Sequence, residues 1–468
     1  MSLSNTHFGA RRIGELLKDK KSIFFVGVGG INMSSLAHVS LVGGMKVGGS
    51  DRVCSHLTER LESEGVEIFY SHNEKNLDGY EALVYTVAIS EDNPEYVRAM
   101  REGIPCISRA DYMGYLMTAY KRRIGVSGMH GKSTCTSMCA SVLIGADTDP
   151  TVLSGAELSM MGGAYRVGES KEHFLFEACE YMDSFLDFNP NIAVVLNIEM
   201  DHVDYFKSME HIKRSYASFA SIAGKGGCVI ANADDSDVTD ALANILPRIV
   251  SFGISNKDAD VLAENVTCKK GRYSFDILKN EKKICRVQLS VSGYHNIYNA
   301  LATAAVALEC GLGGEQIKSG LEAFCGAARR MEYKGECGGA EIYDDYAHHP
   351  TEIRATLEGA KGMLGEGGRL WCVFQSHTYS RTAALLSEFA ESLSLADEVL
   401  ICDIYAAREE NIYGVTPEKL AELIEGARAV HGFDEPAEIL KRELRNGDVA
   451  IIMGAGDVWK VFERLDLK

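Results

Sequence analysis

The 468-residue chain has no long apolar run, no CxxC pair and no excess of basic residues, and each absence excludes a class of protein. No stretch approaches the roughly 18 uncharged apolar residues that would cross a bilayer. The first 20 residues contain no apolar segment of signal-peptide length. Low-complexity tracts and solenoid repeats are absent as well. We therefore expect a cytoplasmic protein without a membrane partner.

Negative charge dominates the composition, with 66 Asp plus Glu against 48 Lys plus Arg and a net charge of −18. This balance argues against nucleic acid as a main partner, although small anionic ligands need only local donors. The 13 cysteines are scattered, and the closest pair, Cys135 and Cys139, is spaced for about one helical turn. We interpret the cysteines as reduced, buried thiols rather than a disulfide framework or a zinc site.

Short apolar runs alternate with helical patterns almost from end to end, which is typical of α/β architecture with parallel sheets. The pattern divides the chain into three parts, which we place at 1–118, 119–325 and 326–468. The expected strands are Ser22–Val28, Met45–Gly48, Val66–Phe69, Leu83–Val87 and Pro105–Ser108, then Ile124–Val126, Phe174–Phe176, Ala193–Asn197 and Cys228–Ala231, and finally Ala340–Tyr343, Leu370–Phe374, Glu398–Asp403 and Asp448–Met453.

The first expected strand ends in a glycine-rich turn that contains Gly27, Gly29 and Gly30 and opens a helix. Glycines there let backbone N–H groups and the helix N-terminus approach a diphosphate. Asp51 follows the next strand, at the position of the acid that binds a ribose in nicotinamide enzymes. The turn is compatible with a dinucleotide, with another nucleotide, or with a strand-to-helix connection that binds nothing.

A second glycine-rich loop lies between an expected strand and an expected helix. Its amides can wrap a triphosphate, with Lys132 between the β- and γ-phosphates and the Ser133 hydroxyl on Mg²⁺. The spacing is tighter than GxxxxGK[ST], because Val126 stands where that pattern has its first glycine. The sequence nevertheless predicts a phosphate site formed by Gly128, Met129, His130, Gly131, Lys132, Ser133 and Thr134.

Acids and a histidine follow later strands of the same part. Glu180 follows the strand at 174–176, and His202 lies between Asp201 and Asp204 after the strand at 193–197. Because the carboxyl ends of parallel strands meet at one edge, we expect these groups beside the phosphate loop. Carboxylates there suit Mg²⁺. Glu177, Asp183 and Asp187 are equally compatible with solvated charges and with a place in this site.

Polar clusters recur at later strand ends and helix starts. Asn296 and Asn299 either cap a helix or contact a base. The paired Arg329 and Arg330 stand at a domain junction and can reach phosphate. Two further clusters are too rich in acids, histidines and hydroxyls to be purely structural: Asp344, Asp345, Tyr346, His348 and His349, and then His377, Thr378, Tyr379 and Arg381.

This ordered set of motifs resembles the Mur ligase family of peptidoglycan synthesis over nearly the whole chain. The motifs are FVGVGGINMS, GMHGKST, EACEY, NIEMDHVDYF, GYHNIYNALA, RRMEYKG, YDDYAHHPTEI, FQSHTYSRT and DIYAARE. The GxxGK[ST] pattern is shared by all Mur ligases and by folylpolyglutamate synthases. The combination of DDYAHHPTEI with HTYSRT is narrower and resembles the members that add L-alanine.

The resemblance implies three domains: an N-terminal Rossmann-like domain, a central P-loop ATPase-type domain with a mostly parallel sheet, and a C-terminal Rossmann-like domain. The first turn would then bind a UDP diphosphate instead of a nicotinamide cofactor. The implied site residues are Gly27, Gly29, Gly30, Asp51 and His72 for the UDP-sugar, loop 128–134 with His295, Asn296, Arg329 and Asp345 for ATP, Ser133, Glu180 and His202 for Mg²⁺, Tyr346, His348, His377 and Arg381 for the acceptor pocket, and Lys132, Glu180, His202, His348 and Arg381 for catalysis.

The implied reaction is ATP-dependent amide formation between L-alanine and the lactyl carboxylate of UDP-N-acetylmuramate, through an acyl phosphate. ATP and Mg²⁺ are the implied cofactors, and His348 is our candidate for the base that deprotonates the amine. The implied partners are the small-molecule substrates UDP-N-acetylmuramate, L-alanine and ATP. The sequence leaves the oligomeric state open between monomer and dimer, and it leaves glycine and L-serine open as acceptors.

Three residues depart from the family pattern: Asn32 and Thr378 replace a glycine and an arginine, and Cys179 replaces the aspartate of EADE. One alternative function is a recycling ligase that attaches an intact tripeptide to UDP-N-acetylmuramate. The segment EACEYMDSFLDFNPN contains no Lys or Arg, which favours addition of a single residue. A nicotinamide-dependent oxidoreductase would have no use for the loop at 128–133. An idle nucleotide-binding regulator would not need Lys132, Glu180, His202 and Arg381.

Overall fold

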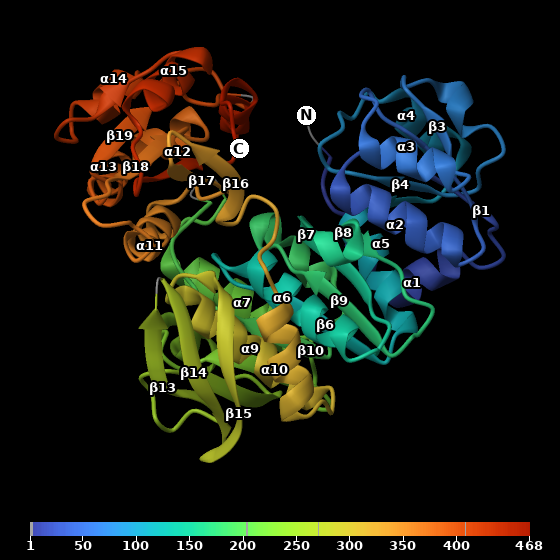
Figure 1. Cartoon of the computed structure of the whole chain (residues 1–468). Coiled ribbons are helices and arrows are strands. Elements are labelled where there is room, and N and C mark those ends of the chain that lie inside the picture. The colour runs from blue at the N-terminus through green and yellow to red at the C-terminus, as the bar shows by residue number, and fades with distance from the viewer. Residues whose placement is uncertain (1–2, 203–204, 270, 408) are drawn as a thin grey trace. The chain divides into compact units, whose positions relative to one another are not determined.

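The computed structural model describes residues 3–202, 205–269, 271–407 and 409–468 (Figure 1). These residues form two compact units, Met1–Val261 with Ala302–Gly320, and Leu262–Leu301 with Leu321–Lys468. Within these ranges, every helix is too short or too polar to cross a lipid bilayer. The α/β class expected from the sequence is confirmed, since the sheets are mostly parallel.

The first part of unit 1 is a parallel sheet covered on both faces, in the order β3–β2–β1–β4–β5. Phe25 packs into a core shared with α1, α2, α3 and α5, whereas its neighbour Phe24 faces α4 and η1. The order reverses between β1 and β4, the place where open α/β sheets bind ligands. The elements are α1 (Gly9–Leu16), β1 (Ser22–Val26), α2 (Ile31–Val42), β2 (Lys46–Ser50), α3 (His56–Ser63), β3 (Glu67–Phe69), η1 (Glu74–Leu77), β4 (Leu83–Tyr85), α4 (Pro94–Glu102), β5 (Cys106–Ser108), α5 (Arg109–Leu116) and η2 (Met117–Ala119).

The second part of unit 1 has the strand order β12–β11–β10–β6–β9–β7–β8, in which β8 runs antiparallel to β7. The strand β6 lies between β9 and β10 and is parallel to both. The carboxyl ends of these three strands therefore meet at one edge. The elements are β6 (Arg122–Ser127), α6 (Lys132–Gly145), β7 (Thr151–Leu158), η3 (Ser159–Met161), β8 (Gly163–Arg166), β9 (His173–Glu177), η4 (Tyr181–Asp187), β10 (Ile192–Val195), α7 (Met209–Ser221), β11 (Cys228–Asn232), α8 (Ser236–Leu242) and β12 (Arg248–Gly253).

Unit 2 combines the antiparallel pair of β14 and β15 with a C-terminal sheet in the order β16–β17–β21–β18–β19–β20, which is parallel except that β16 runs antiparallel to β17. Cys372 of this sheet packs against α11, α13 and α14, whereas its neighbour Trp371 faces α15 and η5. The elements are β13 (Val261–Lys269), β14 (Arg272–Lys279), β15 (Lys282–Ser292), β16 (Glu332–Cys337), β17 (Ala340–Asp345), α11 (Pro350–Lys361), β18 (Leu370–Phe374), α12 (Tyr379–Ala384), α13 (Leu386–Leu393), β19 (Glu398–Ile401), α14 (Pro417–Ala421), β20 (Arg428–Ala429), α15 (Asp434–Glu443), β21 (Val449–Met453) and η5 (Val458–Arg464). The residues of α9 (His295–Glu309) and α10 (Gly314–Ala323) are divided between the two units.

The expected buried strands are present, and β18 has the predicted bounds. Strands β13, β14 and β15 are not expected from the apolar pattern of the sequence. They are neighbours in the order β15–β14–β13, and β14 and β15 are antiparallel. The backbone leaves the helical region at Leu385, which separates α12 from α13.

Candidate active site

The phosphate loop of unit 1 follows β6 and is shaped by two glycines. Gly128 and Gly131 have φ angles of +145° and +82°, a region that side-chain-bearing residues rarely adopt. Gly131 is also the N-cap of α6, so the first N–H groups of that helix lack acceptors within it. Asn197, just beyond β10, braces the loop: its Oδ1 accepts the His130 N–H at 2.8 Å and its Nδ2 donates to His130 O at 2.9 Å.

Lys132, Glu180 and His202 meet at the ends of β6, β9 and β10. Lys132 Nζ lies 3.1 Å from Glu180 Oε1 and 3.0 Å from Oε2, and it also donates to the carbonyl oxygen of Gly128 at 2.6 Å. His202 Nε2 lies 3.2 Å from Glu180 Oε1. The structure thus brings together three side chains that lie 70 residues apart from first to last in the sequence. Asp204 lies outside the described residues.

The charges of this cluster stabilise one another. The Glu180 carboxylate is 1% exposed. Burial alone would raise its pKa, but the Lys132 ammonium and the His202 hydrogen bond outweigh burial and lower it. Burial likewise opposes the charge of Lys132, yet the field of Glu180 raises the pKa of that ammonium. Both groups are therefore charged at neutral pH.

Ser133 and Glu177 form a second contact beneath the loop. The Ser133 hydroxyl donates to Glu177 Oε2 at 2.9 Å, and the same oxygen accepts the Gly155 N–H at 2.9 Å. Asp183 accepts a hydrogen bond from Tyr205 Oη at 2.6 Å, and the Asp187 side chain is 5% exposed. These acids are therefore engaged within the fold and are not solvated charges. With Glu180, the Ser133 hydroxyl offers oxygen donors of the kind that Mg²⁺ prefers.

In the first glycine turn of unit 1, the Asp51 carboxylate accepts hydrogen bonds from backbone N–H groups. Asp51 Oδ2 accepts the Gly29 N–H at 2.8 Å, and Oδ1 accepts the Arg52 N–H at 2.7 Å. A Cβ on Gly29 would lie 2.8 Å from Asp51 Oδ2, so glycine is required for this closure. The N–H groups of Gly27 and Val28 donate to Ser50 O at 2.8 and 3.1 Å. Asp51 thus shapes the turn itself.

In unit 2, Tyr346, His348 and His377 gather at the carboxyl ends of β17 and β18. The rings of His348 and His377 have centroids 6.2 Å apart, and His377 stacks on Tyr405 at 5.4 Å. Burial and the nearby Arg381 guanidinium lower the pKa of His377. Among the described residues, His377 Nδ1 is buried without a hydrogen-bond partner. Such an atom is costly unless a ligand uses it.

The tautomer of His348 follows from its neighbours. Its Nδ1 lies 3.0 Å from the carbonyl oxygen of Tyr346 and 3.3 Å from Glu352 Oε2. Both neighbours only accept hydrogen bonds, so Nδ1 carries the proton and Nε2 keeps a lone pair in the neutral ring. Glu352 also accepts the His348 N–H at 3.0 Å. Glu352 is a positioning group that the motif reading did not single out.

The remaining predicted ATP residues of unit 2 are engaged in local contacts. Asp345 accepts the N–H groups of Met331 and Ala347, both at 2.8 Å. Arg329 donates to the carbonyl oxygen of Gly454 at 2.6 Å and lies over the Tyr346 ring at 5.0 Å. Asn296 donates to Ser292 O at 2.7 Å, while the neighbouring His295 is exposed. Asn296 Oδ1 accepts a hydrogen bond from Asn299 Nδ2 at 3.0 Å, so the two asparagines contact each other at the start of α9.

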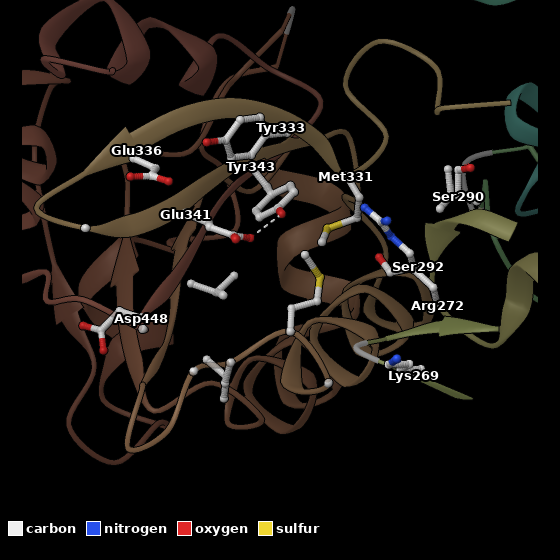
Figure 2. Close-up of a pocket in the computed structure, with 18 of the residues that line it drawn as sticks. Lys269, Arg272, Ser290, Ser292, Met331, Tyr333, Glu336, Glu341, Tyr343 and Asp448 are labelled. Carbon is white, nitrogen blue, oxygen red and sulfur yellow. Dashed lines mark hydrogen bonds between the residues drawn. The ribbon is translucent and has the colours of Figure 1, made fainter. Parts of the chain in front are cut away.

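A polar cavity of about 970 Å³ lies elsewhere in unit 2 (Figure 2). Lys269 and Arg272 line one side, and Glu336 and Glu341 come from β16 and β17. Tyr343 Oη donates to Glu341 Oε2 at 2.6 Å inside it. Glu341 is near the amino end of β17, whereas Tyr346 and His348 follow the carboxyl end, so this cavity is separate from the histidine cluster.

Sequence reasoning missed Asn197, Glu352 and Glu95. Asn197 begins the motif NIEMDHVDYF and Glu352 lies within YDDYAHHPTEI, but no role was expected of either side chain, and Glu352 has the position of an ordinary acid in the first turn of a helix. Glu95 also lies in a first helical turn, and it is completely buried. Its complete burial distinguishes Glu95 from an ordinary surface acid, and that burial is visible only in the folded structure.

Three family models match the chain. They are described as Mur ligase family, catalytic domain, over residues 22–121, Mur ligase middle domain over 126–307, and Mur ligase, glutamate ligase domain, over 329–456. Together they span most of the sequence, and each covers one of the three groups of motifs described above.

Curated proteins and solved structures extend this similarity. The UDP-N-acetylmuramate–L-alanine ligase of Caldanaerobacter subterraneus subsp. tengcongensis is 45% identical over 453 residues, which cover 96% of this chain and 98% of the relative. The structure of UDP-N-acetylmuramate-alanine ligase MurC from Thermotoga maritima matches with a TM-score of 0.78 and 28% identity, over 95% and 97% of the two chains. A murein peptide ligase from Psychrobacter arcticus matches with a TM-score of 0.72 and 25% identity, over 95% and 98%.

Proposed function

Because this chain belongs to the Mur ligase family, we propose that it is an ATP-dependent ligase that joins L-alanine to the lactyl carboxylate of UDP-N-acetylmuramate. The observation that carries the proposal is the meeting of Lys132, Glu180 and His202 beside a glycine-shaped phosphate loop. A phosphate loop with a buried, charged lysine supports phosphoryl transfer. The relative with 45% identity is named for this acceptor, which supports L-alanine over the tripeptide alternative.

The first half-reaction is attack of the lactyl carboxylate on the γ-phosphorus of ATP. The Lys132 ammonium offsets the negative charge of the phosphate oxygens, and the N–H groups at the start of α6 cradle them. Ser133, Glu180 and His202 would hold Mg²⁺, which when bound neutralises charge between the β- and γ-phosphate oxygens. The products of this step are ADP and an acyl phosphate.

The second half-reaction is attack of the L-alanine amine on the acyl phosphate, which expels inorganic phosphate. The amine must lose a proton, and we assign that proton to His348 Nε2. The carbonyl oxygen of Tyr346 favours the Nδ1–H tautomer, which leaves the basic lone pair of the neutral ring on Nε2. We place the carboxylate end of the acceptor near His377 and Arg381, where the unpartnered ring nitrogen of His377 supports a ligand.

We assign the sugar nucleotide to the first part of unit 1, with its diphosphate at Gly27, Gly29 and Gly30. Asp51 acts there by holding the turn in shape. His72, which lies 3.1 Å from Ser50 Oγ, is our candidate for a side-chain contact to the diphosphate. We assign the adenosine of ATP to His295, Asn296, Arg329 and Asp345. We place the three domains at residues 1–118, 119–325 and 326–468.

The deciding experiment measures phosphate release from ATP with UDP-N-acetylmuramate and, in separate reactions, L-alanine, glycine, L-serine or the tripeptide. We expect the fastest release with L-alanine, together with a product whose mass equals the two substrates minus water. Release that depends on the tripeptide instead would support the recycling ligase. A Lys132→Ala variant is the matched control and should release no phosphate above background. Absence of release with every acceptor would overturn the proposal.

A further inference from the structure

Glu95 is a completely buried acid in the first turn of α4. Its Oε1 accepts the Asn73 N–H at 3.2 Å and the Asn76 Nδ2–H at 2.9 Å. Its Oε2 is also buried, has no hydrogen-bond donor among the described residues, and lies 3.1 Å from His72 Nδ1. Burial of a carboxylate oxygen is costly without a polar neighbour, and His72 is the residue beside Oε2.

His72 is held on one side of its ring. Nδ1 lies 3.1 Å from Glu95 Oε2 and 3.1 Å from Ser50 Oγ, and the side chain is 14% exposed. Nδ1 thus faces Ser50 Oγ and the Glu95 carboxylate, and the ring presents Nε2 on its opposite edge. An imidazole N–H at that edge is a donor for a phosphate oxygen.

Ser50 connects His72 to the first glycine turn. The carbonyl oxygen of Ser50 accepts the N–H groups of Gly27 and Val28, while its hydroxyl contacts His72. The Asp51 carboxylate is occupied by N–H groups of the turn and of the residue that follows it. Glu95 is therefore the acid whose charge faces His72 among the contacts of the described residues. Ser50 thus contacts both His72 and the backbone of the glycine turn that we propose for the diphosphate.

We propose that Glu95 is a positioning residue for sugar-nucleotide binding, which holds the His72 ring by its Nδ1 edge so that the opposite edge, with Nε2, binds the diphosphate. This inference rests on the proposed function and deepens it. A glutamine at 95 keeps an oxygen for Asn73 and Asn76 but places an N–H₂ against His72 Nδ1. The carboxylate that faces Nδ1 is then gone, while Asn73 and Asn76 keep their hydrogen-bond acceptor.

The test is calorimetric titration of the full chain with UDP-N-acetylmuramate, UDP and uridine. We expect Glu95→Gln to weaken binding of both diphosphates about ten-fold, because the buried carboxylate no longer holds the His72 ring in position. Binding of uridine, which has no phosphate, should be unchanged. In a His72→Ala background, Glu95→Gln should have no further effect, because the residue it acts through is gone.

Asp111 provides the matched control. Its carboxylate is 1% exposed in the same part of unit 1, but it accepts the N–H groups of Phe8 and Gly9 and does not contact His72. Asp111→Asn should lower the melting temperature without weakening UDP binding. Equal losses in Asp111→Asn and Glu95→Gln would reduce Glu95 to a structural residue and overturn the inference.

A spectroscopic measurement covers the case in which Glu95→Gln does not fold. In the wild-type protein, the ¹⁵N shift of His72 Nε2 should change when UDP-N-acetylmuramate binds. A His72 Nε2 shift that does not respond to the sugar nucleotide overturns the inference even if the proposed function stands. Failure of the wild type to bind UDP-N-acetylmuramate at all would instead contradict the proposed function.

Discussion

Replacing Lys132 by methionine should destabilise the protein as well as abolish turnover. Both oxygens of the Glu180 carboxylate lie within 3.1 Å of Lys132 Nζ, and the carboxylate is 1% exposed. Methionine keeps the apolar stem of lysine and removes only the charge. The remaining partner of Glu180 is His202, 3.2 Å away. Breaking a buried ion pair from one side costs about 3–5 kcal/mol, because the other charge stays buried and unpaired.

Thermal unfolding without nucleotide measures this cost. At roughly 2–4 °C per kcal/mol for a domain of 150–250 residues, Lys132→Met should lower the melting temperature by about 6–20 °C. The double variant Lys132→Met/Glu180→Gln should recover most of that loss, because neither charge then remains. It should still release no phosphate, since the ammonium that offsets the phosphate charge is absent. Stability and activity are thereby separated.

Lys213 is the matched control for this experiment. It pairs with Asp237 at 2.7 Å and Asp240 at 2.8 Å, but on the surface, where water screens the charges. Lys213→Met should leave the melting temperature and turnover nearly unchanged. If the double variant melts below Lys132→Met, the two residues do not form a buried pair. If Lys132→Met turns over normally, the lysine does not act on phosphate.

Three further outcomes are expected. Gly29→Val should remove the melting-temperature increase caused by UDP-N-acetylmuramate and leave ATP binding intact, because a Cβ would displace Asp51 from the turn. If NAD stabilises the wild-type protein instead, the turn binds a nicotinamide cofactor. His348→Gln should slow amide formation by about 10²–10⁴-fold while hydroxylamine still traps the acyl phosphate, and loss of trapping would move His348 to the first half-reaction. Burial raises the pKa of Asp344 to about 6, so its contribution to stability is full below the ordinary value of 3.8 and is lost as pH rises through 6. Melting curves of Asp344→Asn should lack that decline, and an unchanged slope would show that another group titrates.

The glycine loops and strand-end acids could be predicted because parallel strands place their carboxyl ends on one edge. Lys132, Glu180 and His202 each follow a short apolar run, and that local pattern suffices to put them on the same side. Their contact additionally requires that β9 and β10 flank β6, and this adjacency is a property of the sheet order. No spacing along the chain encodes it.

Groups that act through tertiary partners could not be predicted. Glu95 and Glu352 occupy the first turn of a helix, where acids are common because they favour the helix dipole. The expected role of Asp51 as a ribose ligand followed from its position after β2. In the fold its carboxylate accepts the Gly29 N–H, a contact that depends on the exact path of the turn. The place of Asp51 beside the glycine turn could be predicted from the sequence, but its hydrogen bond with the Gly29 N–H could not.

The departure at Cys179 shows how charge balance explains a substitution that the motif alone presents as a loss. Burial, together with the negative charge of Glu180, raises the pKa of Cys179 to about 11, so the thiol is neutral at physiological pH. The Lys132 ammonium already has Glu180 as its partner, and His202 contacts the same carboxylate. A second carboxylate at 179 would add a negative charge without a further cation among these three groups. A neutral thiol therefore preserves the balance on which the Lys132–Glu180 pair depends.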